Sequence, residues 1–313
     1  MSVPRLAGID IGTLTCRLLI ADLPPESPLR ELRSERRILR LGEDVDRTKR
    51  LNTAAIDRVI QCLKEWREVI DGYRVDACTA VATSAVRDAC NRDEFLDRVK
   101  READFDVEVI TGEEEARRTM LGIRSGLPAG VREVLALDIG GGSTEFFFDR
   151  PGQQPLARSV DIGVVRLCER LLHHDPPTAE EVRQASDWIR DETEAALANV
   201  PQPVDMTFVG TAGTITSLAA MAQKLPAYEP ARIHNYHLTL ATIHVLEQEL
   251  LSRTNAERVG LPGLEKGREE VIAAGAIFIR TVMETLNERE CLVSDLGLRE
   301  GVLLDLAARR ASA

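Results

Sequence analysis

The sequence has no apolar run long enough to cross a membrane and no cysteine pattern typical of a structural site. No stretch approaches the ~20 apolar residues that a transmembrane helix needs, and the N-terminus MSVPRLAGID does not resemble a signal peptide. The six cysteines are scattered, with no C-x-x-C pair and no histidine at ligand spacing. These absences disfavour a membrane protein, a disulfide framework and a zinc site. We expect a cytoplasmic protein whose thiols are reduced and mostly buried.

The five histidines form no triad with a candidate nucleophile, so serine-type hydrolysis has little support. The formal net charge of −11 argues against nonspecific binding of nucleic acid. Local charge differs from this total, because several arginines lie in or beside segments rich in Gly, Ser and Thr. We expect about half of them to form weak surface ion pairs, and we select Arg87 as a phosphate contact. These arginines are Arg17, Arg87, Arg92, Arg117, Arg118, Arg166 and Arg299.

The length and composition indicate a globular protein with two domains. At 313 residues the chain exceeds the usual size of one core. Its apolar content of 44% and charged content of 29% are typical of a folded chain with a core. We expect lobe I to span 1–120, with a C-terminal helix over 299–313 that packs back on it, and lobe II to span 121–298.

One sequence pattern occurs twice, as IDIGTLTCRLLIAD at 9–22 and as LDIGGGSTEFFFDR at 137–150. Each copy places an apolar run before an aspartate, then a Gly-containing turn, then a second apolar run, which predicts two β-hairpins. One such turn alone would favour an ordinary hairpin, but the duplication indicates two related lobes. Gly turns and hydroxyl groups are suited to binding a phosphate chain. The candidate phosphate-binding residues are Gly12, Thr13, Thr15, Gly140, Gly141, Gly142, Ser143 and Thr144.

An aspartate precedes each of these two turns. Asp10 and Asp138 cannot favourably touch phosphate directly, but they can hold Mg²⁺, or water on Mg²⁺, beside it. A third Gly/Thr turn follows an apolar run at 206–209 and leads into a helix, which is where α/β sheets bind ligands. It adds Gly210, Gly213 and Thr214 to the candidate phosphate-binding residues.

The remaining pattern alternates strands and helices, which indicates an α/β fold class. A helix is predicted over 53–70 and strands over 75–82 and 105–110. After the second of these strands, Thr111 followed by Glu114 predicts a capping box and the start of a helix. Three glutamates at a helix start are commonly dipole-matching surface residues. The alternative is that one of them orients the water that attacks a terminal phosphate, a task that needs a positioned carboxylate and no strong base.

Six segments, in this order and spacing, resemble the exopolyphosphatase and guanosine pentaphosphate phosphohydrolase family. The resemblance covers essentially the whole chain, and the family lies in the superfamily of actin, chaperone ATPases and sugar kinases. The segments are DIGTLTCRLL, ATSAVRDACN, ITGEEEAR, DIGGGSTE, GTAGTITSLAA and VSDLGLREGVL.

The resemblance implies two ribonuclease-H-like lobes, as in actin-like ATPases, with an interdomain cleft. It also implies release of orthophosphate from the end of polyphosphate, or of the terminal 5′ phosphate of pppGpp, with Mg²⁺ or alternatively Mn²⁺. Glu115 matches the proposed catalytic glutamate, Asp138 and Glu145 match residues tied to metal and catalysis, and Arg87 matches a phosphate contact. We therefore assign catalysis to Glu115 and Glu145, and metal binding to Asp10, Asp138 and Glu145. The expected partner is polyphosphate or guanosine penta- or tetraphosphate. We expect no binding of nucleic acid or membrane, and a homodimer is one of the possible assemblies.

The chain departs from the family pattern in two places. Leu14 stands where the first turn usually carries Asn, and a chain ending at Ala313 leaves no room for the additional C-terminal helical module of long members. We therefore expect a preference for short chains or for a nucleotide. Two other classes of function stay open: a non-catalytic sensor of nucleotides or alarmones, and, with less support, a kinase of the same fold.

Overall fold

The computed structural model describes residues 3–24, 27–198, 200 and 206–311, and the chain divides into two compact units. Unit 1 comprises Met1–Gly126 and Leu296–Ala313, and unit 2 comprises Leu127–Asp295. The boundary expected at 120/121 falls inside helix α5 (Gly112–Arg124), which stays whole in unit 1. None of the helices in the described segments combines the length and the apolar character needed to span a membrane.

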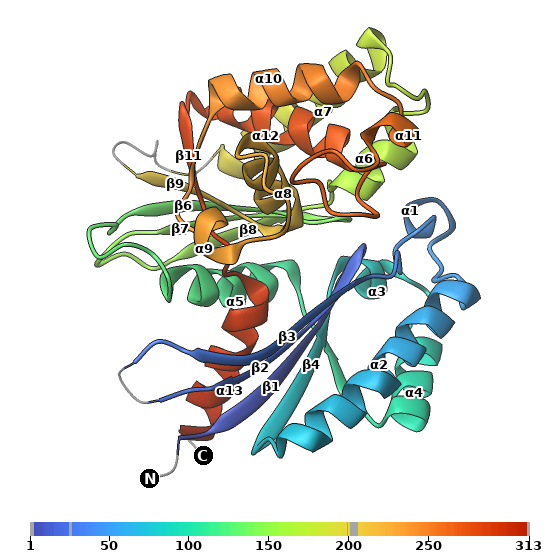
Figure 1. Cartoon of the computed structure of the whole chain (residues 1–313), viewed down its shortest axis with the longest axis vertical. Coiled ribbons are helices and arrows are strands. Elements are labelled where there is room, and N and C mark those ends of the chain that lie inside the picture. The colour runs from blue at the N-terminus through green and yellow to red at the C-terminus, as the bar shows by residue number, and fades with distance from the viewer. Residues whose placement is uncertain (1–2, 25–26, 199, 201–205, 312–313) are drawn as a thin grey trace. The chain divides into compact units, whose positions relative to one another are not determined.

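Unit 1 contains a mixed sheet in the order β3-β2-β1-β4-β5 (Figure 1). The first repeated segment forms the predicted hairpin, in which β1 and β2 are antiparallel, while β4 and β5 run parallel to β1. The strands are β1 (Arg5–Ile11), β2 (Thr15–Asp22), β3 (Arg30–Ile38), β4 (Ala77–Ala82) and β5 (Val107–Val109). The helices besides α5 are α1 (Val45–Thr48), α2 (Thr53–Tyr73), α3 (Ser84–Asp88), α4 (Arg92–Ala103) and α13 (Leu298–Ala311).

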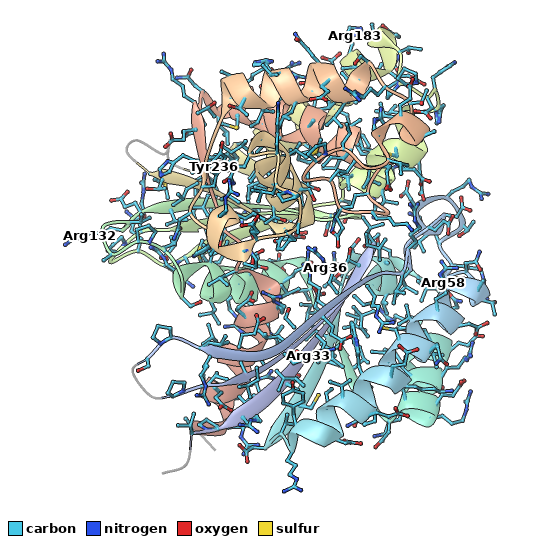
Figure 2. All side chains as sticks on the ribbon, viewed as in Figure 1. Arg33, Arg36, Arg58, Arg132, Arg183 and Tyr236 are labelled. Carbon is cyan, nitrogen blue, oxygen red and sulfur yellow. The ribbon has the colours of Figure 1, made fainter. Side chains whose placement is uncertain are left out.

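Strand β3 was not predicted, because its sequence RELRSERRI lacks the apolar alternation of a strand. It lies at the edge of the sheet and pairs only with β2. An edge strand gains its stability from backbone hydrogen bonds on one side, and charged side chains there prevent pairing with other chains. Arg33 and Arg36 are carried by this strand (Figure 2). Its register places Arg36 directly opposite Arg17 of β2.

Helices cover both faces of the unit 1 sheet (Figure 1). On one face, Ile9 and Leu18 pack with Trp66 of α2 and Phe95 of α4 in the larger core. Trp66 is fully buried, and its indole Nε1–H donates to a Glu35 oxygen at 2.9 Å. On the other face α13 packs on β1 and β2, with Leu303 in a second cluster. The C-terminal helix thus belongs to unit 1.

Helices α5 and α13 touch through their backbones. A Cβ atom on Gly301 would lie 1.7 Å from the Arg118 carbonyl oxygen, and one on Gly122 would lie 1.9 Å from the Gly297 carbonyl oxygen. Ion pairs surround this contact: Arg117 Nη2 lies 2.5 Å from Asp305 Oδ1, and Arg118 Nη2 lies 2.8 Å from Glu108 Oε1. The position of α5 is therefore fixed by close packing and by charge.

The predicted capping box at the start of α5 is only half formed. Thr111 accepts a hydrogen bond from the Glu114 backbone N–H at 3.2 Å, as expected. The Glu114 carboxylate does not return to the Thr111 backbone, because it accepts from Arg117 Nε and Arg118 Nε at 2.7 Å each. The hydrogen bond from Arg117 lowers the pKa of Glu114 to about 2, with burial opposing and Arg118 adding to the effect.

We predict that this ion pair contributes acid-sensitive stability. A carboxyl group whose pKa is depressed in the folded state stabilises the fold above its ordinary pKa, and that contribution is lost as the pH falls. Unfolding by denaturant should therefore lose about 1 kcal/mol from this group between pH 4.5 and about 2. Glu114→Gln should flatten this part of the profile, whereas the exposed neighbour Glu113→Gln should not. Equal acid sensitivity of wild type and Glu114→Gln would contradict the assignment.

Unit 2 contains a second mixed sheet, in the order β10-β11-β9-β6-β7-β8. The second repeated segment forms the antiparallel hairpin β6–β7, and β9 runs parallel to β6. The strands are β6 (Val134–Ile139), β7 (Thr144–Asp149), β8 (Leu156–Val160), β9 (Thr207–Thr211), β10 (His237–Thr239) and β11 (Glu290–Val293). Both units have the α/β fold class predicted from the sequence.

The helices of unit 2 pack around α12, which contacts α6, α7, α8 and α10. Thr178 caps α7, and here the capping box with Glu181 is complete. Trp188 of α7 lies under the Arg170 guanidinium, 5.0 Å from the ring centroid, which fits a packing role. The helices are α6 (Val164–Leu171), α7 (Ala179–Leu197), α8 (Ala212–Ala222), α9 (Pro230–Ile233), α10 (Leu240–Leu251), α11 (Asn255–Arg258) and α12 (Ile272–Leu286).

The six cysteines are free thiols. Only three of them are fully buried, so the expectation of mostly buried thiols holds for half of the set. Burial raises the pKa of Cys62 to about 12 and that of Cys78 to about 11, which makes these two thiols unreactive. The buried thiols are Cys16, Cys62 and Cys291, the partly buried ones are Cys78 and Cys168, and Cys90 is exposed.

Candidate functional site

In unit 1 the candidate residues gather where three parallel strands end. Ile11 of β1 lies opposite Ala82 of β4, and Ala82 lies opposite Val109 of β5, so the carboxyl ends of these strands are level. Ligands of α/β proteins bind at this edge of a sheet. The Gly12 turn follows β1, Arg87 follows β4 on α3, and Glu115 follows β5 on α5. The topology therefore brings together three motifs that are separated in the sequence.

The Gly12 turn is closed by a hydrogen bond from the Gly12 N–H to the Thr15 carbonyl oxygen at 3.1 Å. A Cβ atom on Gly12 would lie 2.8 Å from that oxygen, so the turn requires glycine at this position. Thr13 and Thr15 are both buried within this turn. A second segment supports it: the Gly42 N–H donates to the Thr13 carbonyl oxygen at 2.8 Å, and a Cβ on Gly42 would lie 2.2 Å from Thr13 Cγ2.

Leu14, the departure from the family pattern, serves the turn through its backbone. Its carbonyl oxygen accepts hydrogen bonds from the N–H groups of Leu39 and Arg40 at 2.9 and 3.0 Å, and its side chain is buried. The carboxylate of Asp10, just before the turn, is 5% exposed, and its Oδ2 lies 3.7 Å from Arg17 Nη1. The backbone hydrogen bonds of the first turn are therefore formed without an Asn side-chain amide at position 14.

The three glutamates at the start of α5 have different surroundings, which separates the alternatives that the sequence leaves open. Glu113 is exposed, and Glu114 is held by Arg117 and Arg118. Glu115 is 8% exposed and turns toward Arg87. Of the three, only Glu115 lies with other candidate site residues.

Arg87 and Glu115 are in contact. Arg87 Nη1 lies 3.3 Å from Glu115 Oε2 and also donates to the Ile110 carbonyl oxygen at 3.1 Å. Both side chains are mostly buried, so this ion pair is less screened than one on the surface. The bond to Ile110 fixes the guanidinium at the end of β5, next to the first turn of α5. Two residues that lie far apart in the sequence form one constellation.

In unit 2 the turn after β6 repeats the geometry of the Gly12 turn. The Gly140 N–H donates to the Ser143 carbonyl oxygen at 3.0 Å, and a Cβ on Gly140 would lie 2.8 Å from that oxygen. Gly163 packs against this turn, because a Cβ there would lie 2.5 Å from the Gly141 carbonyl oxygen. The N–H groups of Val164 and Val165 donate to the carbonyl oxygens of Gly140 and Gly141, so the start of α6 stabilises the turn.

Two acidic residues are opposite each other in the strands that flank this turn. Asp138 of β6 is paired directly with Glu145 of β7, and Glu145 is 2% exposed. The Ser159 hydroxyl, on the neighbouring strand β8, donates to Glu145 Oε1 at 2.8 Å. Within the parts of the chain that the structure describes, no cluster of three or more His, Cys, Asp or Glu side chains can hold a metal ion.

The third Gly/Thr turn connects β9 to α8. Ala212 adopts the left-handed conformation with φ 69°, a costly geometry that often marks functional turns. The Arg268 guanidinium packs against the turn, since a Cβ on Gly213 would lie 2.1 Å from Arg268 Nη2. Arg268 is 3% exposed, and its Nε donates to Glu265 at 2.8 Å. An arginine beside the start of α8 adds positive charge where anions already bind well.

Three of the candidate phosphate-binding residues of unit 2 also have contacts within the fold. The Thr144 hydroxyl donates to the Ile162 carbonyl oxygen at 2.7 Å, so its hydrogen stabilises the turn. Gly210 lies inside β9 and makes room for Cys291, while the Thr214 methyl packs on Gly275 of α12. Each of these three residues therefore has a structural contact, and its binding of phosphate stays a prediction. The other candidates of unit 2 are Gly140, Gly141, Gly142, Ser143 and Gly213.

Sequence reasoning missed Ser159, Gly163 and Arg268. None of them lies in a repeated or Gly-rich motif, and each reaches its turn only through the tertiary fold. The candidate residues form two sets, and each set lies within its own unit. Asp10, Gly12, Thr13, Thr15, Arg87 and Glu115 belong to unit 1, and the others belong to unit 2.

Comparison with protein families shows a match to the model of the Ppx/GppA phosphatase family over residues 19–310. The chain is 38% identical to "Exopolyphosphatase 2" of Mycobacterium tuberculosis, with 98% of this chain and 100% of the relative covered. It is 28% identical to the "Guanosine-5'-triphosphate,3'-diphosphate pyrophosphatase" of Aeromonas salmonicida, over 97% of this chain and 59% of the relative.

Among solved structures, the chain is similar to the Aquifex aeolicus member of the same family. The sequences are 38% identical, 99% of each chain is covered, and the TM-score is 0.82. An exopolyphosphatase from Cytophaga hutchinsonii gives a TM-score of 0.88 at 29% identity, with 96% of this chain and 97% of that chain covered. These similarities confirm a mixed α/β fold with two sheets, which is the fold of the Ppx/GppA family.

Proposed function

Because this chain belongs to the Ppx/GppA phosphatase family, we propose that it is an exopolyphosphatase that releases orthophosphate from the end of polyphosphate, preferentially short chains, or from the 5′ end of pppGpp. The family and the relatives of this chain indicate that it is a phosphoanhydride hydrolase.

The contact between Arg87 and Glu115 is the main structural support for this function. A carboxylate that orients water and a guanidinium that binds phosphate must lie within a few ångströms of each other to act on one phosphorus atom. These two groups lie 3.3 Å apart beside the Gly12 turn. In the substrate complex, the terminal phosphate oxygens take over the Arg87 hydrogen bond, and Glu115 is released to hold the attacking water.

The chemistry asked of these residues is modest. Phosphoryl transfer passes through a loose transition state, so catalysis depends on positioning and on stabilising charge. Glu115 accepts a hydrogen bond from the water and directs its lone pair at the terminal phosphorus. Arg87 donates to the phosphate oxygens, on which negative charge is spread, and backbone N–H groups of the Gly12 turn hold the anionic chain.

The candidate carboxylates of each unit fit a divalent cation of the Mg²⁺ type. Mg²⁺ in phosphate sites is usually held by one or two carboxylates, with substrate phosphates and water as the other ligands. Asp138 and Glu145, paired across β6 and β7, supply two such carboxylates, and Asp10 is the candidate in unit 1. A bound Mg²⁺ or Mn²⁺ would neutralise charge on the phosphate oxygens.

Orthophosphate release from short polyphosphate, long polyphosphate, pppGpp and ATP, each with Mg²⁺, tests the proposal. We expect release from short polyphosphate or pppGpp that exceeds release from ATP. Binding of these ligands without release would favour the alarmone or nucleotide sensor instead. Loss of the terminal phosphate that requires an added acceptor would indicate a kinase. Release from none of them, with no binding, would contradict all three functions.

A further inference from the structure

Ser84 lies at the same sheet edge as Arg87 and Glu115. It is the first residue of α3, two positions after the last residue of β4. The preceding residue is tied to β1, because the Thr83 N–H donates to the Ile11 carbonyl oxygen at 3.3 Å. The strand order β1-β4-β5 therefore places Ser84 between the Gly12 turn, which follows β1, and Glu115, which follows β5.

The Ser84 side chain is buried in a way that ordinary packing does not explain. It is 2% exposed, and within the described part of the chain its Oγ atom has no hydrogen-bond partner. Buried hydroxyl groups in native proteins nearly always have a partner, and one without a partner costs stability. Alanine would fill the same space without this cost.

The direction of the side chain is given by the helix. Ala85, Val86 and Ala89 belong to the hydrophobic core on one side of α3. Ser84 and Arg87 are three positions apart, so they share the other face of the helix. Arg87 on that face reaches the Ile110 carbonyl oxygen and Glu115. The Ser84 hydroxyl is therefore on the side of the candidate site.

We propose that Ser84 is a further catalytic residue, whose hydroxyl donates a hydrogen bond to the attacking water when substrate is bound. This inference rests on the proposed hydrolysis. A water molecule held by Glu115 alone can rotate about that hydrogen bond. A second hydrogen bond, from Ser84 to one water lone pair, leaves the other lone pair directed at the phosphorus atom and fixes the angle of attack.

The test is Ser84→Ala, with kcat, KM and thermal stability measured on the full chain with short polyphosphate and pppGpp. We expect kcat to fall by at least ~10-fold, with KM within about twofold of wild type. The melting temperature should stay equal or rise, because the hydroxyl that is removed has no partner in the unliganded protein. Ser84→Thr, which keeps a hydroxyl, should retain a kcat nearer to wild type.

Ser186→Ala provides a matched control in unit 2. Ser186 is also buried, but its hydroxyl donates to the Val182 carbonyl oxygen at 2.9 Å and accepts from Arg280 Nη2 at 2.8 Å. Its removal should lower the melting temperature and leave kcat unchanged.

The two proposals fail in different ways. If wild type releases no orthophosphate from any substrate, the proposed hydrolysis fails and the role of Ser84 fails with it. If wild type is active and Ser84→Ala has the same kcat, only the role of Ser84 fails. A raised KM with unchanged kcat would also overturn the inference, because it would make Ser84 a ground-state contact to phosphate.

Discussion

Replacing Glu115 with glutamine lowers the rate of orthophosphate release by ~10²–10⁴-fold and leaves substrate binding nearly unchanged. The amide has the shape of the carboxylate but accepts hydrogen bonds only weakly, so the attacking water loses its orientation. Binding survives because the phosphate contacts come from Arg87 and from the backbone of the Gly12 turn. The measurement pairs single-turnover phosphate release with equilibrium binding of the same substrate, in wild type and in Glu115→Gln.

Glu113→Gln is the matched control for this experiment. It makes the same chemical change two positions earlier, on an exposed side chain of the same helical turn. We expect wild-type activity from it. Unchanged release by Glu115→Gln would refute the role of Glu115, and equal losses in both variants would indicate that a general change at the start of α5 is responsible.

The second large effect is expected at Arg87. Arg87→Ala should lower kcat/KM by ~10²–10³-fold, because it removes a charged donor that stabilises the transferring phosphate. It also removes the group that holds the Glu115 carboxylate at 3.3 Å. Both kcat and KM should change. Arg87→Lys should recover part of the loss, because lysine keeps the charge but not the planar fork that spans two acceptors.

Arg92→Ala serves as the control for Arg87. Arg92 lies in the same sequence segment, but its side chain is 53% exposed and is 3.6 Å from Asp93. Such a surface pair contributes little, so activity should be unchanged. If Arg92→Ala and Arg87→Ala are equally impaired, the assignment of Arg87 loses its basis. If neither is impaired, phosphate is held elsewhere.

The hairpins and the parallel strands could be predicted because their sequences contain both the apolar pattern and the turn residues. The two Gly turns show this best, since Gly12 and Gly140 each allow a tight contact with a carbonyl oxygen that no side chain permits. Strand β3 could not be predicted. Six of the nine residues in RELRSERRI are charged, and the strand exists because β2 offers it an edge of unpaired backbone groups.

Site residues that lie within a sequence motif could be predicted from the sequence. Residues that reach the site only because the fold brings two distant segments together could not. Glu115 could be separated from Glu113 and Glu114 only by the resemblance, whereas the structure separates them by their neighbours. Ser159 and Arg268 reach the turns of unit 2 from segments without any motif. Conversely, Thr144 has the right residue type and the right position, but its hydroxyl bonds to Ile162.

Leu14 illustrates how a change of residue type can leave a turn intact. An asparagine at this position would offer an amide to a ligand, and leucine cannot. The backbone of Leu14 still anchors the segment after β3 through two hydrogen bonds, and its side chain is buried. The turn is therefore preserved by its backbone, although the amide that could contact a ligand is missing.

The most direct test of the account is hydrolysis in water enriched in ¹⁸O, followed by mass analysis of the products from short polyphosphate and pppGpp. Attack of water on the terminal phosphorus places one solvent oxygen in each released orthophosphate and none in the remaining chain or nucleotide. We predict this distribution in wild type. Label in the remaining chain, or released orthophosphate without label, would contradict the proposal that water held by Glu115 attacks the terminal phosphate.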